Sequence, residues 1–213
     1  KPEIVSGEES FGANLFGADH CGFIYHEIAE GKCILIKLAK PSKVNHILIQ
    51  LRDGDSYSYS VEVSLDQRNW EKVVNYKLNW CLGKQMIYFD PKIIKFIKII
   101  GTGTWNNKDP KFYMTNLQCS FDSEPLKTLN NYVLPNFNVA HSHKGARLIT
   151  SANNAINQSL LIGIDDFYGN KYKEEYPTPN HLITGSPNDN ITIHLSQPFV
   201  VNKIKIQLKQ YYK

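Results

Sequence analysis

"YSYSVEVSLDQRNWEKVV", residues 57–74, predicts a strand, a tight polar turn and the start of a second strand. In the first strand, apolar and polar side chains alternate with the period of two that sends neighbours to opposite faces of a sheet. One face takes Tyr59, Val61, Val63 and Leu65, and the other takes Ser58, Ser60, Glu62 and Ser64. Residues Asp66 to Asn69 form the turn, where we expect Asp66 to shape the backbone rather than to bind a metal. We expect Trp70, which follows, to pack over the end of the sheet rather than to contact a ligand.

The same alternation recurs along the chain, most clearly at 34–38 and 47–51. Short turn sequences separate such runs, namely Asp53-Gly54-Asp55, Asp90-Pro91 and Gly101 to Gly103. No window of 12 residues has the 3.6-residue apolar spacing of an amphipathic helix. The pattern therefore predicts an all-β chain folded as an antiparallel sandwich or barrel.

Size and charge narrow the functional classes. The chain has 213 residues, of which 42% are hydrophobic, so it can form one large domain or two small ones. It has no run of 18 apolar residues, and residues 1–20 have no apolar core after basic residues, so we expect neither a membrane span nor a signal peptide. The net charge of +4 is thinly spread, and Arg occurs only at Arg52, Arg68 and Arg147. A nucleic-acid interface gathers Arg on one face, so we expect no nucleic-acid partner.

An internal repeat sets the predicted domain organisation. Residues 34–51, ILIKLAKPSKVNHILIQL, align without a gap to residues 191–208, ITIHLSQPFVVNKIKIQL, with ten of 18 positions identical. Each copy predicts a strand, a proline turn and a returning strand. We therefore expect a first copy at 1–122, a linker at 123–135 and a second copy at 136–213. The second copy has no counterpart of residues 57–121, so we expect it to be incomplete and the chain to be a fragment of a longer protein.

The four cysteines are Cys21, Cys33, Cys81 and Cys119, and their spacing contains no CxxC pair. We expect buried free thiols in a reducing compartment, because a core of this size does not need disulfides. Two glycosylation sequons, at Asn157 and Asn190, point the other way.

The pattern V-x-V-S-x-D-x-x-x-W-x-x-V, at residues 61–73, followed by FIKIIGTG at 96–103, resembles the discoidin, or coagulation factor V/VIII type C, domains. Within that group, the chain is most similar to the tandem discoidin-like repeats of BTB/POZ proteins. The resemblance implies a jelly-roll β-sandwich of the galactose-binding-like superfamily, whose loops at one end bind the ligand. In secreted members a disulfide joins a Cys near the start to one near the end. Cys119 fits the end, but residues 1–20 have no Cys, which favours an intracellular, cytoplasmic home.

The candidate site lies in three segments that strand packing does not explain, at 15–27, 52–59 and 101–113, which we expect to be loops at strand ends. Their polar and aromatic residues are Asp19, His20, His26, Arg52, Asp53, Asp55, Trp105 and Asn106. An aromatic face beside short polar side chains suits a sugar or a protein segment. The alternative is that these residues form solvated turns without a ligand, because Asp, Asn and Gly favour turns.

Histidine residues in the first segment have two further interpretations. His20, Cys21 and His26 could bind zinc, but they span six residues and lack a fourth ligand, so we expect no metal site. His26 and His181 occupy matching places in the two copies. This match indicates a shared role in the fold, such as a hydrogen bond that holds a loop.

The chain contains none of the sequence motifs of nucleophilic, metal-dependent or phosphate-binding catalysis, so we expect neither enzyme activity nor a cofactor. The sequence therefore predicts a non-catalytic module that recognises a protein partner. The resemblance implies that this partner is recruited to a cullin-3 ubiquitin ligase, through a BTB domain that this chain lacks. The alternatives are a discoidin domain that binds a glycan or a lipid headgroup, and a structural subunit of a larger assembly.

Overall fold

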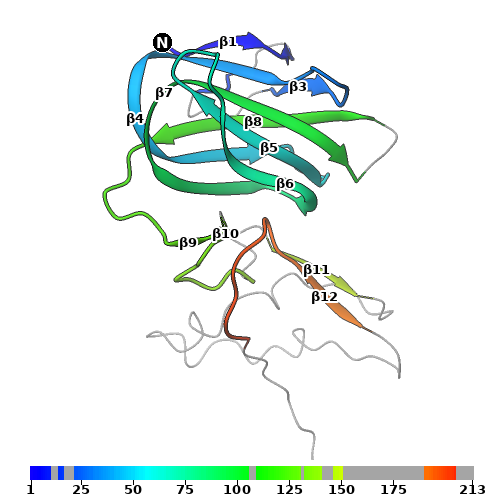
Figure 1. The fold of residues 1–213 in the computed structure, drawn as a ribbon. Coiled ribbons are helices and arrows are strands. Elements are labelled where there is room, and N and C mark those ends of the chain that lie inside the picture. Colours follow the sequence, from blue (N-terminus) through cyan, green and yellow to red (C-terminus); the bar gives the residue numbers. More distant parts are fainter. Residues whose placement is uncertain are drawn as a thin grey trace, which may run out of the picture.

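The computed structural model describes residues 1–10, 14–16, 22–105, 109–130, 132–140, 146–150 and 190–204. Within these ranges all regular structure is β-strand (Figure 1). The first eight strands are β1 (Glu3–Ser6), β2 (Glu8–Glu9), β3 (Ile24–Glu27), β4 (Ile34–Leu51), β5 (Tyr57–Ser64), β6 (Glu71–Cys81), β7 (Lys84–Thr104) and β8 (Lys111–Ser120). Four short strands follow: β9 (Thr128–Leu129), β10 (Tyr132–Val133), β11 (Arg147–Thr150) and β12 (Ile191–His194).

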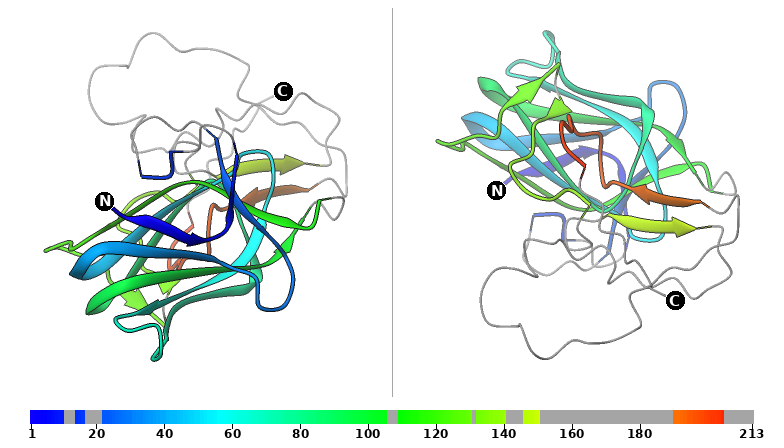
Figure 2. Two further views of the ribbon diagram at one scale, coloured as in Figure 1. Left: turned by 90° about the horizontal axis from the view of Figure 1, so that it is seen from above. Right: turned by 90° about the horizontal axis from the view of Figure 1, so that it is seen from below.

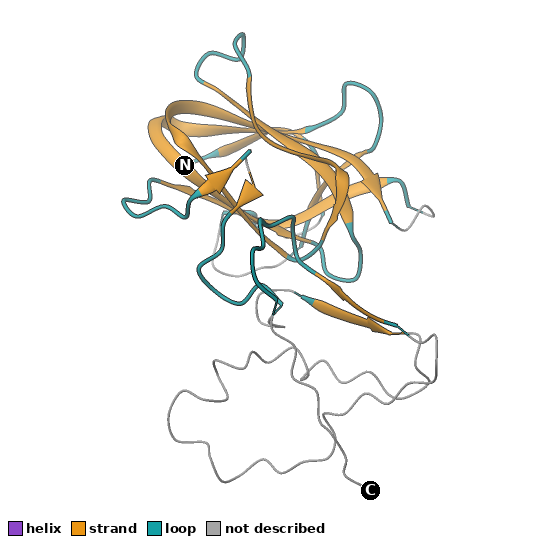
Figure 3. Cartoon of the chain, turned by 60° about the horizontal axis from the view of Figure 1, so that its bottom comes forward, coloured by secondary structure: helices purple, strands orange, loops and turns teal. Residues whose placement is uncertain are grey.

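The first eight strands form one antiparallel sheet in the order β2-β3-β8-β4-β7-β5-β6, with β1 also paired to β4. The long strands β4 and β7 bend as they run together, so the sheet wraps around a single core (Figures 1 and 3). Strands β9 to β12 lie along one side of this body (Figure 2). The predicted all-β, antiparallel architecture is thus confirmed in the described residues.

The core consists of the inward-facing side chains of the long strands. Ile36, Ile47 and Ile49 from β4 and Ile97 and Ile99 from β7 are completely buried. Three aromatic rings fill the end of the core nearest the β7–β8 connection: Phe112 lies with its ring centroid 5.3 Å from that of Tyr57 and 5.8 Å from that of Tyr59. Aromatic side chains bury large areas and so contribute strongly to the hydrophobic stabilisation of this end.

Three predicted turns lie within strands instead. Pro41 lies inside β4, where pairing with β7 is interrupted between Lys37 and Ser42. Asp90-Pro91 lies inside β7, next to a second interruption. Because proline has no N–H to donate, a bulge accommodates it without breaking the strand. Gly101 and Gly103 also belong to β7, and their absent side chains leave room for neighbouring residues rather than for a turn.

Strand β5 shows that the predicted alternation was only half correct. Tyr59, Val61 and Val63 are buried as expected, but Ser58, Ser60 and Ser64 are buried too. These side chains are small and have close neighbours on the second face, since Ser58 Oγ lies 3.1 Å from Thr102 Oγ1 and the Ser64 hydroxyl donates a hydrogen bond of 3.1 Å to Asp66. Leu65 lies beyond the strand end and is 49% exposed.

The predicted second copy is described only in part. Its strand β12 pairs with β11, matching the first half of the repeated stretch, whereas His181 and Asn157 lie outside the described residues. The predicted boundaries at 122 and 136 and the incompleteness of the second copy remain predictions.

Candidate functional site

Parts of all three predicted segments meet at one end of the sheet, because Phe23 of the first lies beside Arg52 of the second and Tyr113 of the third. The loop 52–56 connects β4 to β5, and residue 105 follows β7 directly. The two are joined because the backbone N–H of Trp105 donates a hydrogen bond of 2.8 Å to the carbonyl of Ser56. Tyr57 and Thr104 are paired in the adjoining ladder. Loop 52–56 and Trp105 therefore form one continuous surface, which we call the β5/β7 rim.

Asp55 organises the β5/β7 rim. One of its carboxylate oxygens accepts a hydrogen bond of 2.7 Å from the Thr104 hydroxyl, and the other accepts one of 2.7 Å from the Ser56 N–H. Hydrogen bonds to a carboxylate are among the stronger ones in proteins, so the loop is fixed to the end of β7. Asp55 thus has a structural role, whereas Asp53 in the same loop is exposed.

Arg52 lies on the other side of this loop, against aromatic rings. Its guanidinium carbon lies 4.5 Å from the ring centroid of Tyr113 and 5.4 Å from that of Phe23, which are cation–π distances. The Tyr113 hydroxyl donates a hydrogen bond of 2.6 Å to Asp109. Burial, followed by this bond to a carboxylate, raises the pKa of Tyr113 to about 12, so the phenol stays protonated as a donor.

Trp105 is the main exposed aromatic residue of the rim, with 69% of its surface accessible. Its ring rests edge-on against Trp80 of β6, with centroids 5.5 Å apart and planes at 89°. Trp80 is itself 38% exposed. Trp80 was not among the residues predicted from the sequence, because nothing in the local pattern of β6 indicates which residue outside that strand its ring will contact. Together the two rings form an apolar patch next to the loop 52–56, to which the Trp105 backbone is hydrogen-bonded.

His26 was wrongly placed among the loop residues, because it belongs to β3 and is 3% exposed. Its Nε2 accepts a hydrogen bond of 2.9 Å from the Gly101 N–H, and its Nδ1 lies 2.7 Å from the Glu27 carbonyl oxygen. His26 therefore makes a structural hydrogen bond, but the bond joins two strands rather than holding a loop, and the role shared with His181 remains a prediction. Asp19, His20, Cys21 and Asn106 lie outside the described residues. Among the residues that the structure does describe, no cluster of three or more His, Cys, Asp or Glu side chains could hold a metal.

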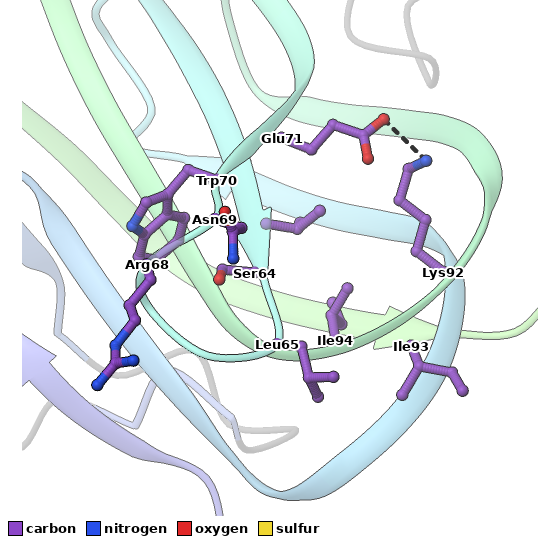
Figure 4. Close-up of a pocket in the computed structure, with 10 residues that line it drawn as sticks. Ser64, Leu65, Arg68, Asn69, Trp70, Glu71, Lys92, Ile93 and Ile94 are labelled. Carbon is purple, nitrogen blue, oxygen red and sulfur yellow. Dashed lines mark ion pairs between the residues drawn. The ribbon is translucent and has the colours of Figure 1, made fainter.

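A hollow lies at the opposite end of β5 from the β5/β7 rim, around the turn that follows β5 (Figure 4). As predicted, Asp66 shapes this turn, accepting hydrogen bonds from the N–H groups of Arg68 (2.8 Å) and Asn69 (2.9 Å). These bonds lower the pKa of Asp66 well below its usual range. Trp70, however, is outside the core. It is half-buried and lines the hollow, whose volume is about 540 Å³. The centroid of its ring lies 3.6 Å from Lys98 Nζ.

Lys98 explains why Trp70 stays at the surface. The ammonium group also forms an ion pair of 3.1 Å with Glu62, so the indole ring is covered by a charged side chain rather than by the core. The far rim of the hollow carries a second ion pair, Lys92 with Glu71 at 2.8 Å.

The part of the chain that the structure describes contains no long apolar helix of the kind that could span a membrane.

Comparison with known proteins supports the fold and its relationships. Residues 26–114 match the family model described as the F5/8 type C domain. The chain is 32% identical over 98% of its length to BTB/POZ domain-containing protein 9 of Homo sapiens, and 30% identical over 88% to that of Drosophila melanogaster. The matched region covers 33% of the length of the human protein and 25% of that of the Drosophila protein, so the chain corresponds to about a third of the human relative or less.

Solved structures with a similar fold include carbohydrate-binding modules. One is chitosan-binding module 1 from a chitosanase/glucanase of Paenibacillus sp. IK-5, at 20% identity and a TM-score of 0.46, covering 57% of this chain and 94% of that one. Another is the CBM32 module of AlyQ in complex with 4,5-unsaturated mannuronic acid, at 14% identity and a TM-score of 0.45, covering 56% and 97%.

Proposed function

Residues 26–114 form an F5/8 type C, or discoidin, domain, and from this we propose that the chain is a non-catalytic module that docks a protein partner at the β5/β7 rim. The observation that carries the proposal is Trp105, a large aromatic side chain that is 69% exposed yet supported from below by Trp80. An aromatic ring held in place loses little conformational freedom when a partner covers it, and such residues are enriched among interface hot spots.

The chemistry of the rim indicates the kind of segment that fits. The two indole rings offer an apolar face, and the exposed Asp53 carboxylate lies on the neighbouring loop. A partner segment that presents an aromatic or long aliphatic side chain next to a Lys or Arg would satisfy both features. Asp55 supports this surface through its hydrogen bond from Thr104, and the exposed Arg52 lies over the ring of Tyr113.

We further propose that this docking serves a cullin-3 ubiquitin ligase inside the cell. The support is the similarity over 98% of the chain to BTB/POZ domain-containing proteins, of which the chain matches about a third. In this arrangement the BTB domain, elsewhere in the complete protein, would contact cullin-3, and the discoidin domain would hold the partner to be ubiquitylated.

The first test is affinity capture from cell lysate with the full chain as bait. The variants are Trp105→Ala and Asp53→Ala at the rim, and Ile93→Ala as the matched control. Ile93 is also an exposed hydrophobic side chain, at 63%, but it lines the hollow at the other end of β5. We expect a protein retained by the wild type and the control to be lost with Trp105→Ala. Equal retention by all four baits would place the partner site elsewhere.

The ligase role has its own test, which uses the complete protein. We expect cullin-3 to co-purify with it regardless of the Trp105→Ala change, and the captured partner to accumulate when cullin-3 is depleted. A partner whose abundance does not respond to cullin-3 would leave the docking function standing and remove the ligase role.

A glycan is the second candidate ligand, favoured by the same exposed indole face beside carboxylates, which is suited to stacking and to hydroxyl recognition. A glycan array probed with the wild type and Trp105→Ala distinguishes the two. Binding of a defined sugar that Trp105→Ala abolishes, together with no captured protein, would replace the protein partner with a carbohydrate.

A further inference from the structure

Among the described residues, no strand pairs with one side of the first half of β7. From Lys84 to Tyr88, β7 pairs with β4, whereas β5 pairs with β7 only from Phe96 to Thr104. An open strand edge exposes unpaired N–H and C=O groups and invites association with another segment. We call residues 84–88 the open edge of β7.

A glutamine from the far end of the chain closes this edge. The Met86 N–H donates a hydrogen bond of 2.6 Å to Gln197 Oε1, and Gln197 Nε2 donates one of 2.8 Å to the Met86 carbonyl. A side-chain amide presents one donor and one acceptor as a peptide group does, so Gln197 replaces a strand residue at this position. Gln197 is only 2% exposed, which shields both bonds from water.

The residue before it engages the β6–β7 turn. The Ser196 carbonyl accepts hydrogen bonds from the Leu82 N–H (2.8 Å) and from Gln85 Nε2 (2.9 Å). Gln85 is completely buried, and its Oε1 accepts a hydrogen bond from the Tyr59 hydroxyl inside the core. The contact made by Ser196 therefore satisfies polar groups that would otherwise be buried without all their partners.

Apolar contacts surround these hydrogen bonds. Tyr132 stacks on Tyr76 of β6 with ring centroids 5.9 Å apart, and the buried Val133 forms a bridge with Phe199. The Val200 N–H donates to the Val133 carbonyl at 3.0 Å. Residues 132–133 and 196–200 are thus joined to each other next to the open edge, and Figure 1 shows the orange-to-red segment after β12 running beside β10.

The internal repeat shows that this contact depends on particular residues. In the alignment of 34–51 with 191–208, Ser196 corresponds to Ala39 and Gln197 to Lys40. Ala39 and Lys40 are exposed in the first copy, and Lys has no acceptor with which to receive the Met86 N–H. The side-chain amide of Gln197 is therefore the part of this contact that the first copy lacks, whereas Ser196 contributes a backbone carbonyl that Ala39 also has.

We propose that the open edge of β7 is a docking surface for residues 196–200 of the same chain, and that this contact holds the segment after β12 and the discoidin domain in one fixed orientation. The chain then presents a single rigid body to a partner rather than two modules joined by a flexible linker. His194 adds a contact toward the candidate site, since its Nε2 lies 3.1 Å from the carbonyl oxygen of Trp80.

The decisive measurement on the wild type is backbone amide relaxation by NMR. We expect residues 196–200 and the strands of the discoidin domain to share one rotational correlation time. A clearly shorter time for residues 196–200 would overturn the proposal without the need for any variant.

Amide hydrogen exchange then tests the residues. In Gln197→Lys, which copies the first repeat, we expect the Met86 amide to exchange at least about tenfold faster while the β4–β7 amides near Ile47 stay protected. Ser196→Ala is the matched control, because the Ser196 hydroxyl makes no hydrogen bond within the described residues and the carbonyl is retained. Unchanged exchange at Met86 in Gln197→Lys, or an equal effect of Ser196→Ala, would contradict the proposal.

Discussion

His26 is a neutral imidazole held between two backbone groups. Because the Gly101 N–H can only donate, Nε2 must accept, and the ring proton lies on Nδ1, facing the Glu27 carbonyl. Burial lowers the pKa of His26, which keeps the ring in this neutral form. A histidine that sequence reasoning placed in a ligand loop thus joins β3 to β7.

The stability of the fold should consequently depend on pH. Protonated His26 would point a second N–H at the Gly101 N–H, so protonation is disfavoured in the folded state. In the unfolded chain this histidine has an ordinary pKa of about 6.5, so the unfolded chain takes up the proton first as the pH falls. We expect the free energy of unfolding to be highest above pH 6.5 and to decline below it, by at most about 1.4 kcal/mol per pH unit from this group.

Urea denaturation of the wild type and His26→Gln between pH 7.5 and 5 measures this contribution. The pKa of His46 is also lowered by burial, but His46 is present in both proteins and its effect cancels in the difference. The wild type should lose more stability than the variant as the pH falls. Parallel curves would show that His26 titrates normally.

Single residues of the rim show what local sequence can and cannot predict. Of the predicted loops, 52–56 and Trp105 are confirmed as loop positions, whereas 57–59, 101–104 and 111–113 belong to β5, β7 and β8. The partners of these residues could not be predicted, because Phe23, Trp80 and Tyr113 come from separate segments that only the sheet order brings together. Arg52 remains a predicted binding residue, and its contacts with the rings of Phe23 and Tyr113 are what its local sequence did not indicate.

At the scale of the element, β7 depends on two glycines that sequence analysis assigned to a turn. A Cβ at Gly101 would lie 2.2 Å from Phe112 Cβ, and one at Gly103 would lie 2.7 Å from the Ser58 hydroxyl oxygen. Phe112 is a buried core residue whose Cβ is fixed to the backbone of β8, whereas a serine hydroxyl can rotate away.

We therefore expect Gly101→Ala to destabilise the protein by about 3 kcal/mol or more, and Gly103→Ala by about 1 kcal/mol. Thermal or urea unfolding of the two variants beside the wild type provides the comparison. Equal losses would mean that β8 can move away from β7, and that the close approach of Phe112 is not a requirement of the fold.

The long strands show the same limit of local reasoning. Proline and Asp-Pro sequences usually mark turns, and they were interpreted as such at Pro41 and Pro91. In the structure both lie at irregularities in the β4–β7 ladder, where a missing N–H costs no hydrogen bond. Distinguishing a bulge from a turn requires the partner strand, which is distant in sequence.

At the scale of the whole molecule, the period-two pattern predicted the class of fold because alternation follows from strand geometry itself. The repeat predicted that 191–194 would be a strand like 34–37, and β12 agrees. The contact between residues 196–200 and the open edge of β7 could not be predicted, since it uses positions at which the two copies differ, Lys40 and Gln197.

The fold should also hold together without disulfides. Cys33, Cys81 and Cys119 are free thiols in the structure, and burial raises the pKa of Cys81, so its thiol stays protonated and poorly reactive. We expect the same thermal midpoint with and without a reductant, to within about 1 °C. A disulfide that closed a long loop would contribute about 4 kcal/mol and shift the midpoint of a domain this size by about 8 °C or more. A fall of that size on reduction would show that two of these cysteines pair in solution, and would argue against the reducing compartment in which we propose that the module works.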